Sequence, residues 1–364
     1  MAMMKAAAFW EKGRIEIVDK PIPDVGPNDA LIRITTTTIC GTDVHILKGE
    51  YPVDKGLTVG HEPVGVIEKL GSEVKGYKEG QRVIAGAICP NFNSYAAQDG
   101  YPSQDGSYLV ARGLCGCHGY KATAGWRFGN LIDGTQAQYV LVPDAQANLA
   151  PIPDGLTDEQ VLMCPDIMST GFAGAENANI KIGDTVVVFA QGPIGLCATA
   201  GARLLGATTI IAVDGNDHRL GIAKKMGADV VLNFRNVDVI SEVLKLTGGR
   251  GADSAIEALG TQMTFEQAIK VIKPGGTVSS LGVYSEDLKI PMSAFAAGLG
   301  DHTIRTALCP GGKERMRRLM SVIEANRLDL GVMVTHQRKL DDIVEAYDLF
   351  ANQRDGVLKI AIKP

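Results

Sequence analysis

This sequence has few aromatic residues and only a small net charge. Phe, Trp and Tyr make up 5% of the 364 residues, and the formal net charge is only −5 at pH 7. A net charge this small gives no general electrostatic attraction to nucleic acids or to anionic membranes. We therefore expect neither a nucleic-acid partner nor a membrane partner.

Long uninterrupted hydrophobic runs are also missing. The longest apolar stretch, residues 186–213, contains Gln191, Arg203 and several glycines, which is typical of buried strand and helix rather than of a bilayer span. The first residues have only a short apolar stretch before Glu11 and no cleavage pattern of a signal peptide. We expect a cytoplasmic protein.

Cysteines are few, and their number is odd. Seven of them are scattered over a long chain, which is not the even, closely spaced set that predicts a disulfide framework. Individual thiols are therefore candidate metal ligands. The length itself predicts two domains, at roughly 100–200 residues per domain.

The two halves of the chain have different patterns. Between residues 15 and 142, short β-branched runs alternate with turn residues, which predicts antiparallel strands in a barrel-like domain. Residues 89–130 interrupt this pattern and predict a long loop excursion. After Asp166, the apolar runs TVVVFA, IIAV, VVLN, SAIEAL and TVSSLG predict buried parallel strands of a doubly wound α/β domain. From about Pro310 the pattern predicts two helices and a last strand, VLKIAIKP. The second helix has apolar residues at helical spacing, which are Leu340, Ile343, Val344 and Tyr347.

A glycine-rich turn joins the first of these parallel strands to a helix. In VVVFAQGPIGLCATAGARLLG, Gly192 allows a pyrophosphate to approach the backbone, and Gly195 allows the helix to pack close to the sheet. Pro193 suits the first helical turn, whereas Ala190 stands where the fingerprint has its first glycine. The sequence predicts a dinucleotide site, although glycines at such a turn can also be purely structural.

The next predicted strand ends in an acidic residue. Asp214 is placed where a carboxylate would bind the adenosine ribose hydroxyls and repel a 2′-phosphate. Arg219 could assist at the ribose, but an arginine that opens a helix is equally typical of solvated surface. The cofactor prediction is NAD.

Two short segments of the first half carry candidate metal ligands. CGTDVH contains Cys40, and GHEPVG contains His61 and Glu62. A catalytic zinc site uses three such ligands and leaves one position open. Each residue alone is more typical of a protein core. Their joint presence in one β domain, followed by a dinucleotide-binding pattern, favours a metal site.

These segments resemble a known family over essentially the whole chain. GHEPVG, CGTDVH and AQGPIG are similar to the zinc signature, first-ligand segment and cofactor loop of the zinc-dependent medium-chain alcohol dehydrogenases. CPDIMSTGFAGAE and LCPGG resemble the bacterial secondary-alcohol dehydrogenases, or carbonyl reductases, which are tetramers. The resemblance implies a GroES-like β-barrel catalytic domain (residues 1–165), a Rossmann domain (166–306) and a C-terminal segment that returns to the catalytic domain (307–364). It also implies a small alcohol or ketone substrate and a homotetramer.

The same resemblance implies the metal ligands. They are Cys40, His61 and Asp166, with Glu62 bound in the resting state and exchanged for water or substrate. Thiolate and aspartate neutralise Zn²⁺, and adding Glu62 would leave a net negative charge, which favours that exchange. Asp43 would hold the ring of His61; the alternative is an exposed turn aspartate.

We expect one zinc ion per subunit. Relatives with a second, structural zinc ion carry four grouped cysteines, whereas this chain has only Cys89, Cys115 and Cys117 in that region. A site that includes His118 is the alternative.

The resemblance further implies a proton relay and a substrate pocket. Thr42 would accept the alcohol proton and pass it through the nicotinamide ribose to His45, unless the two are only a strand-end hydroxyl and a surface imidazole. Trp126 would line the substrate pocket, or it packs the loop. The NADP-dependent members of this branch carry Gly, Ser and Arg where this chain has Asp214, Gly215 and Asn216. The resemblance also implies that Thr170, Leu281, Gly282 and Val283 contact the nicotinamide. Pro193 and Ile194, in the glycine-rich turn, are the remaining predicted cofactor contacts.

Three other functions compete with this reading. A polyol dehydrogenase would share the chemistry, but Asp166 and its apolar surroundings disfavour it. A zinc-free quinone or enone reductase does not need Cys40, His61 and Asp166 together. A non-catalytic zinc or nucleotide-binding module does not need Thr42 and His45 behind the metal.

Overall fold

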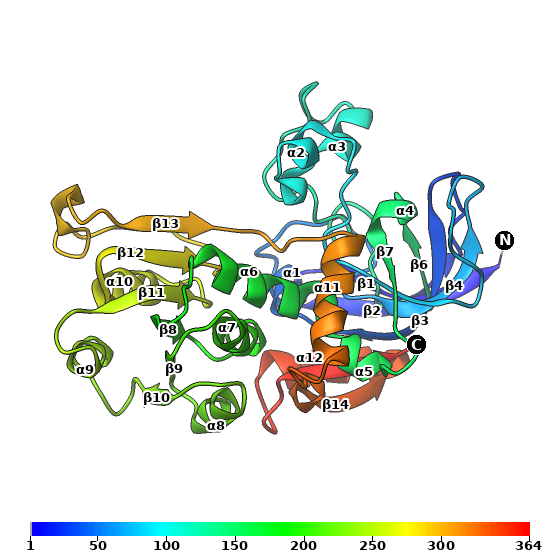
Figure 1. Ribbon diagram of the computed structural model, residues 1–364. Coiled ribbons are helices and arrows are strands. Elements are labelled where there is room, and N and C mark those ends of the chain that lie inside the picture. Colours follow the sequence, from blue (N-terminus) through cyan, green and yellow to red (C-terminus); the bar gives the residue numbers. More distant parts are fainter. Residues whose placement is uncertain (1) are drawn as a thin grey trace. The chain divides into compact units, whose positions relative to one another are not determined.

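The computed structural model describes residues 2–364 (Figure 1). The chain forms two compact units, one made of the residues up to Ser169 together with Cys309–Pro364, and one made of Thr170–Leu308. These divisions lie a few residues beyond the predicted boundaries at 165 and 306. None of the helices within residues 2–364 combines the length and hydropathy that a bilayer span requires.

The first unit is built on a mostly antiparallel sheet with the strand order β14-β15-β3-β4-β5-β7, and β6 also pairs with β3. Its strands are rich in β-branched residues, as predicted, and Ile32, Ile67 and Val83 pack in one of its cores. A separate hairpin, β1-β2, completes the set. The strands are β1 (Met3–Glu11), β2 (Arg14–Pro21), β3 (Ala30–Thr38), β4 (Val64–Leu70), β5 (Arg82–Ala85), β6 (Tyr139–Val142), β7 (Leu149–Pro151), β14 (Val334–Lys339) and β15 (Lys359–Lys363).

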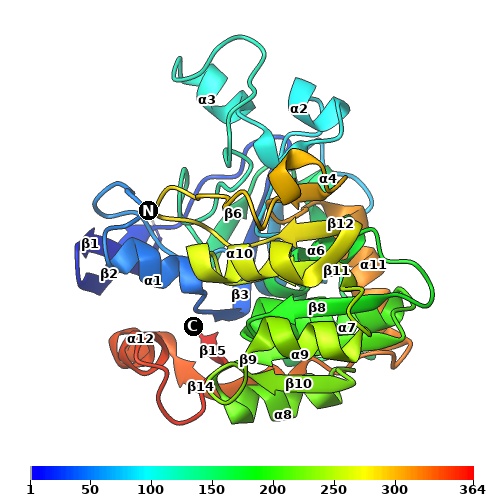
Figure 2. The same cartoon turned by 90° about the vertical axis from the view of Figure 1, so that its left-hand side faces the viewer.

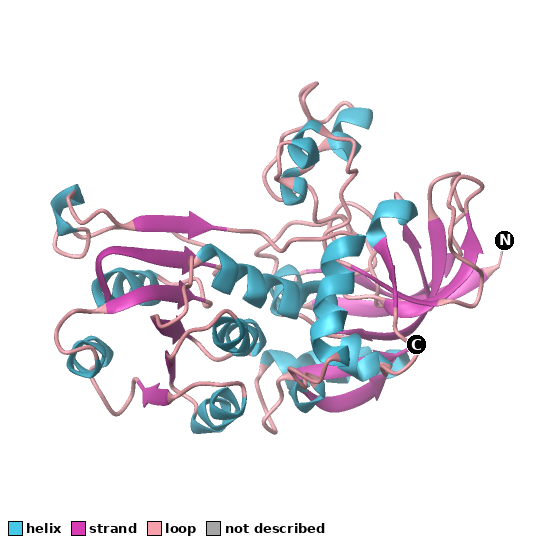
Figure 3. Cartoon of the chain, viewed as in Figure 1, coloured by secondary structure: helices cyan, strands magenta, loops and turns pink. Residues whose placement is uncertain are grey.

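The segment between β5 and β6 is mostly loop (Figure 3), which confirms the predicted excursion. We call residues 89–130 the lobe. A buried ion pair lies in it, because Nη2 of Arg127 donates to Asp105 over 2.8 Å. Asp105 also accepts hydrogen bonds from the backbone N–H groups of Asn91 and Ser107. One carboxylate therefore ties together three parts of the lobe.

Short helices complete the first unit. Ile343 and Tyr347 of α12 are buried, but Val344 is 60% exposed, so its prediction as part of the apolar face was wrong. The helices are α1 (Gly41–Leu47), α2 (Tyr95–Gln98), α3 (Ser107–Ala111), α4 (Ala145–Asn148), α5 (Asp158–Val161), α11 (Lys313–Glu324) and α12 (Ile343–Ala351), with a π-helical turn at Cys164–Met168. This turn continues into α6 (Ser169–Asn177), which belongs to the second unit from Thr170 on.

The second unit is a parallel six-stranded sheet with the order β10-β9-β8-β11-β12-β13. Helices cover both faces (Figure 1), and α10 lies in front of the strands in Figure 2. The strand order reverses between β8 and β11, the place where doubly wound folds bind ligands. The elements are β8 (Thr185–Phe189), α7 (Pro193–Leu204), β9 (Thr209–Asp214), α8 (Asp217–Lys225), β10 (Val230–Asn233), α9 (Val239–Leu246), β11 (Ala252–Glu257), α10 (Gln262–Val271), β12 (Ile272–Ser280) and β13 (Thr303–Thr306).

The predicted α/β class is confirmed, with one strand missed. The apolar runs named above form β8 to β12, whereas β13 was not predicted because TIRT is short and half polar. Gly206 and Gly227 follow α7 and α8 with φ values of 101° and 110°, the left-handed conformation that ends a helix.

Candidate active site

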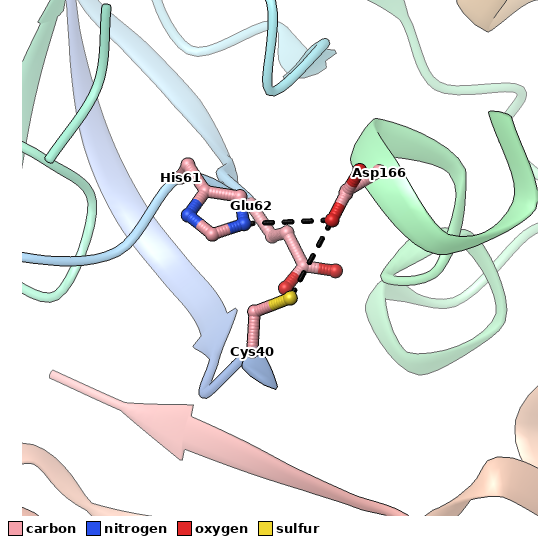
Figure 4. Close-up of side chains that lie close together, drawn as sticks. All are labelled: Cys40, His61, Glu62 and Asp166. Atoms are coloured by element: carbon pink, nitrogen blue, oxygen red, sulfur yellow. Dashed lines mark hydrogen bonds and ion pairs between the residues drawn. The ribbon is translucent and has the colours of Figure 1, made fainter. Parts of the chain in front are cut away.

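Four side chains of the first unit converge on one point (Figure 4). Cys40, His61, Glu62 and Asp166 are all buried, and one potential ligand atom from each lies within 4.8 Å of the others. Oδ2 of Asp166 is 3.5 Å from Sγ of Cys40 and 3.5 Å from Nε2 of His61. Two ligands on one tetrahedral Zn²⁺ lie roughly 3.5 Å apart, given bonds of about 2.0–2.3 Å. The spacing therefore fits a shared zinc ion.

The local fold explains this convergence. Cys40 follows β3 and precedes α1, while His61 and Glu62 precede β4. Because β3 and β4 are antiparallel neighbours, with Thr36 opposite Val64, the end of one strand lies beside the start of the other. Asp166 enters from the π-helical turn, a conformation that is frequent at functional sites.

A buried lysine that the sequence analysis missed completes the cluster. Nζ of Lys359, the first residue of β15, donates to Oε2 of Glu62 over 2.7 Å and to the carbonyl of Ile39 over 3.2 Å. The charge count made from the sequence was therefore wrong, because Lys359 cancels the extra negative charge of Glu62. A lysine within the otherwise apolar run VLKIAI was the signal that could have revealed it.

The electrostatics of this cluster call for a cation. Burial raises the pKa of the Cys40 thiol and of the Glu62 carboxyl, because a low-dielectric interior disfavours their anions. Burial alone would lower the pKa of His61, but Asp43, Asp166 and Cys40 outweigh it and raise that pKa. A divalent cation would meet the same demand for positive charge and keep the thiol and carboxyl groups ionised. Oε1 of Glu62 is buried without a hydrogen-bond partner, so it also has room for a ligand role.

Asp43 lies behind His61. Its side chain is completely buried, which excludes the exposed turn aspartate. Oδ1 lies 3.5 Å from Nδ1 of His61, and Oδ2 accepts hydrogen bonds from the backbone N–H of Cys40 and from Gln136. Gln136 in turn accepts a hydrogen bond of 2.9 Å from Tyr347. Tyr347 was predicted only as a core residue, and Gln136 carries no signal in the sequence that predicts this contact.

The two predicted relay residues lie on one short helix. Oγ1 of Thr42 is 3.9 Å from Sγ of Cys40, so this hydroxyl lies beside the metal cluster. The side chain of His45 is 44% exposed and its Nδ1 is bonded to the carboxylate of Glu50, which lowers the pKa of Glu50. His45 is thus open to solvent and anchored by a partner that the sequence analysis missed.

Trp126 packs beside the metal cluster. Its ring centroid is 6.1 Å from that of His61, in an edge-on arrangement, and Nε1 donates to the carbonyl of Phe128. The apolar ring therefore lies next to a candidate ligand, and the N–H group of the indole already has a hydrogen-bond partner.

The lobe cysteines do not converge. Sγ of Cys89 is buried against the carbonyl of Gly86, and Cys117 is exposed. The ring of His118 packs edge-on against Tyr95. Within residues 2–364, the only group of three or more potential metal ligands is the cluster around Cys40.

The glycine-rich turn has the geometry that its sequence suggested. A Cβ on Gly195 would lie 1.8 Å from the carbonyl oxygen of Ala190, so only glycine fits there. A Cβ on Gly192 would meet nothing within 4 Å, which leaves open space in front of α7. Pro193 is the first residue of α7, and no side chain caps that helix end, so its N–H groups can bind an anion. Ala190 adopts φ 68°, the conformation of the glycine that it replaces.

Asp214 links this turn to the next strand end. It is 7% exposed, and its carboxylate accepts hydrogen bonds from the backbone N–H groups of Gln191 (2.6 Å) and Asn216 (2.8 Å). The ring of Phe234 lies over Gly215, where a Cβ would be 2.5 Å from Cζ. Phe234 was not predicted from the sequence.

Of the other predicted cofactor contacts, Leu281 is buried and Val283 is 59% exposed. Arg219 opens α8, where its backbone N–H donates to the Asn216 side chain. Thr170 is buried in α6 and Ile194 lies in the first turn of α7.

Comparisons with known proteins identify the family of this chain. Residues 26–154 match the alcohol dehydrogenase GroES-like domain, and residues 193–325 match the zinc-binding dehydrogenase family. An alcohol dehydrogenase of Cupriavidus necator is 85% identical, covering 100% of this chain and 99% of that one. An NADP-dependent isopropanol dehydrogenase of Entamoeba histolytica is 38% identical over 99% and 96% of the two chains. The structure of zinc-dependent alcohol dehydrogenase 2 from Streptococcus pneumonia superposes with a TM-score of 0.86 at 32% identity, covering 99% and 98%. The chain therefore belongs to the zinc-type medium-chain alcohol dehydrogenases.

Proposed function

We propose that this zinc-dependent alcohol dehydrogenase interconverts secondary alcohols and ketones with NAD(H), using one zinc ion per subunit. The observation that carries the proposal is the convergence of Cys40, His61 and Asp166, whose ligand atoms have the mutual spacing of a zinc site. A zinc-free reductase would have no use for this buried thiol, imidazole and carboxylate. The relatives named as isopropanol dehydrogenases support the secondary-alcohol class.

The chain's own groups have distinct roles in this proposal. The zinc ion, when bound, supplies a Lewis acid that polarises the substrate oxygen. Lys359 holds one oxygen of Glu62 and leaves the other without a partner, so Glu62 can approach or leave the ligand position without carrying uncompensated charge. Thr42 accepts the substrate proton, and the exposed imidazole of His45 returns it to solvent. Trp126 provides an apolar wall for the alkyl group.

The preference for NAD rests on Asp214. Its carboxylate ends β9, and its two backbone hydrogen bonds hold it at the mouth of the cofactor turn. A 2′-phosphate would meet this negative charge in a partly desolvated place. The relatives from Entamoeba histolytica and Thermoanaerobacter brockii are NADP-dependent, so this chain differs from them in cofactor choice under the proposal.

The cytoplasmic location and the homotetramer remain predictions. Support for association comes from the second unit, where β13 is the last strand of its sheet and leaves one edge unpaired. Met292 and Leu299, in the segment that leads to β13, are 75% and 84% exposed. An open strand edge beside exposed apolar residues is typical of a contact between subunits.

Metal analysis combined with a substrate screen tests the proposal. We expect about one zinc ion per subunit and faster NAD-linked oxidation of propan-2-ol than of ethanol or sorbitol. Cys40→Ser should abolish activity while the protein stays folded, and Cys89→Ser is the matched control, since that buried thiol lies outside the cluster. Full activity in a metal-free preparation would refute the zinc site, and preference for sorbitol would favour the polyol alternative.

A further inference from the structure

Glu257, the last residue of β11, is a completely buried carboxylate with four hydrogen-bond donors. Oε1 accepts from the backbone N–H of Leu259 (2.9 Å) and Gly260 (2.8 Å) and from Oγ1 of Thr264 (2.8 Å). Oε2 accepts from the hydroxyl of Tyr284 over 2.8 Å. A buried carboxylate is costly unless it is fully bonded. This one therefore fixes the segments that supply its donors.

Those segments are two loops at the same edge of the sheet. Residues 258–261 follow β11, and residues 281–284 follow β12. They touch backbone to backbone, because a Cβ on Gly282 would lie 2.2 Å from the nitrogen of Gly260, and a Cβ on Gly260 would lie 2.4 Å from the carbonyl oxygen of Val283. Only glycine permits this approach. Glu257 and the two glycines form one rigid unit, which we call the clamp.

Hydroxyl groups extend the clamp on both sides. Since Tyr284 donates to Glu257, its oxygen accepts the hydrogen bond from Ser280, at 2.8 Å. In the same way Thr264 accepts from Thr261, at 2.8 Å. Burial is the largest cause that raises the pKa of Tyr284, so its hydroxyl stays protonated and able to donate. Every polar atom of this network has a partner, and such networks hold one arrangement.

The clamp lies beside the cofactor turn. β11 is the direct neighbour of β8, and the backbone N–H of Ala258 donates to the carbonyl of Phe189, just before that turn. Ligands of doubly wound sheets bind at the carboxyl ends of the strands, where the strand order reverses. Val283 is held there with its backbone packed on Gly260 and its side chain 59% exposed.

We propose that Glu257 and Tyr284 are positioning residues for the nicotinamide half of the cofactor. They do not touch it themselves. They fix the backbone of residues 281–283, which the family resemblance predicts to contact the nicotinamide. This inference rests on the proposed NAD-linked function. The adenosine half depends on Asp214, so the clamp should act on one end of the cofactor only.

Tyr284→Phe tests this with a minimal change. The variant keeps the ring, which packs edge-on against Phe265 at a centroid distance of 5.9 Å, and loses only the hydroxyl that reaches Glu257. We expect the dissociation constant for NADH to rise about tenfold, as for loss of one hydrogen bond to a charged group. The dissociation constant for ADP-ribose, which lacks the nicotinamide, should change less than about twofold. Both are measured by isothermal titration calorimetry, with melting temperatures recorded in parallel.

Two more variants make the test decisive. Tyr77→Phe is the matched control, because it removes a hydroxyl that donates to the carbonyl of Leu149 in the other unit, and neither ligand should bind differently to it. Glu257→Gln keeps the size of the side chain and should reproduce the selective loss of NADH affinity.

The outcomes separate the clamp from the proposed function. Selective loss of NADH affinity in both variants supports the clamp. Equal loss for NADH and ADP-ribose, or no loss for either, overturns it and leaves the NAD-linked function standing. If the unmodified protein binds neither compound, the cofactor proposal fails and the clamp fails with it.

Discussion

The ammonium group of Lys359 lies 2.7 Å from the carboxylate of Glu62, and both side chains are fully buried, at 1% and 0% exposure. The pair joins β15 to the segment that precedes β4, residues far apart in the sequence. Burial costs each ion its hydration, so neither charge is stable there without the other.

Removing one partner should therefore harm the protein more than removing both. Lys359→Met should lower the free energy of unfolding by roughly 3–5 kcal/mol, since it leaves the Glu62 carboxylate buried and unpaired. Adding Glu62→Gln to it should recover most of this loss. The midpoint of urea unfolding of the zinc-free protein measures both effects. A double variant no more stable than Lys359→Met would show that the pair is not the source of the loss.

The two glycines of the cofactor turn should respond differently to alanine. Gly195→Ala should destabilise the protein by more than about 3 kcal/mol, because the new Cβ overlaps the carbonyl oxygen of Ala190. Gly192→Ala meets open space, so the melting temperature should stay unchanged while the dissociation constant for NADH rises about tenfold. Calorimetry measures both quantities. Unchanged NADH affinity in Gly192→Ala would place the pyrophosphate elsewhere.

Cofactor choice should follow Asp214. We expect kcat/KM with NADH to exceed that with NADPH by at least about tenfold, or roughly 1.4 kcal/mol. Asp214→Gly with Asn216→Arg should narrow or reverse the ratio. The pair should also be less stable than the parent, because Asp214 holds the N–H of Gln191 and Asn216 caps α8, a cap worth about 1 kcal/mol. Equal use of both cofactors by the unmodified enzyme would contradict the role given to Asp214.

The relay through His45 predicts a pH-dependent defect. His45→Ala should lower kcat for alcohol oxidation about tenfold at pH 6 and little at pH 9, where solvent accepts the proton more readily. Zinc content should not change. His336→Ala, on β14, is the matched control and should leave the pH profile intact. An unaltered profile in His45→Ala would remove this residue from the mechanism.

We expect the ion pair between Asp105 and Arg127 to make the stability of the protein depend on pH in the acidic range. Burial raises the pKa of Asp105, but hydrogen bonds from Ser107 and Asn91, and the charge of Arg127, outweigh it, so the folded pKa is lowered. The lowered pKa stabilises the folded protein at any pH above the pKa of Asp in the unfolded chain, about 3.9. This contribution is lost as the pH falls through the pKa of Asp105 in the folded protein. Asp105→Asn should therefore be less stable than the parent at pH 7, with the difference shrinking below about pH 4.

Urea unfolding midpoints between pH 3 and pH 7 measure this difference. Asp99→Asn is the control, because that aspartate lies on the surface of the same lobe and accepts only a tyrosine hydroxyl. A difference between Asp105→Asn and the parent that does not depend on pH would show that charge is not its cause.

Local patterns were enough to predict much of this protein. The β-branched runs and the glycine turn gave the two-part α/β fold, because alternation and turn chemistry act over a few residues. CGTDVH and GHEPVG named three of the four clustered side chains, and the family resemblance supplied Asp166. The short strand β13 was not predicted, because its four residues show no hydrophobic periodicity.

The unpredicted residues share one property, which is that their partners are distant in the sequence. Lys359 and Glu62 are brought together by the pairing of β15 with β3, and Gln136 and Tyr347 meet through packing of α12. Nothing near Glu257 in the sequence shows that Tyr284 will reach it. Polar contacts of this kind depend on the completed topology, so composition and spacing do not reveal them.

The position of Lys359 also affects how the protein is made. Synthesis delivers Cys40, His61 and Glu62 first, then Asp166, and only later the lysine that neutralises Glu62. Until β15 pairs with β3, the carboxylate of Glu62 lacks the ammonium group of Lys359 that neutralises it. β15 follows all four candidate ligands in the sequence, so Glu62 gains its buried counter-charge only after the segments that carry those ligands have been synthesised.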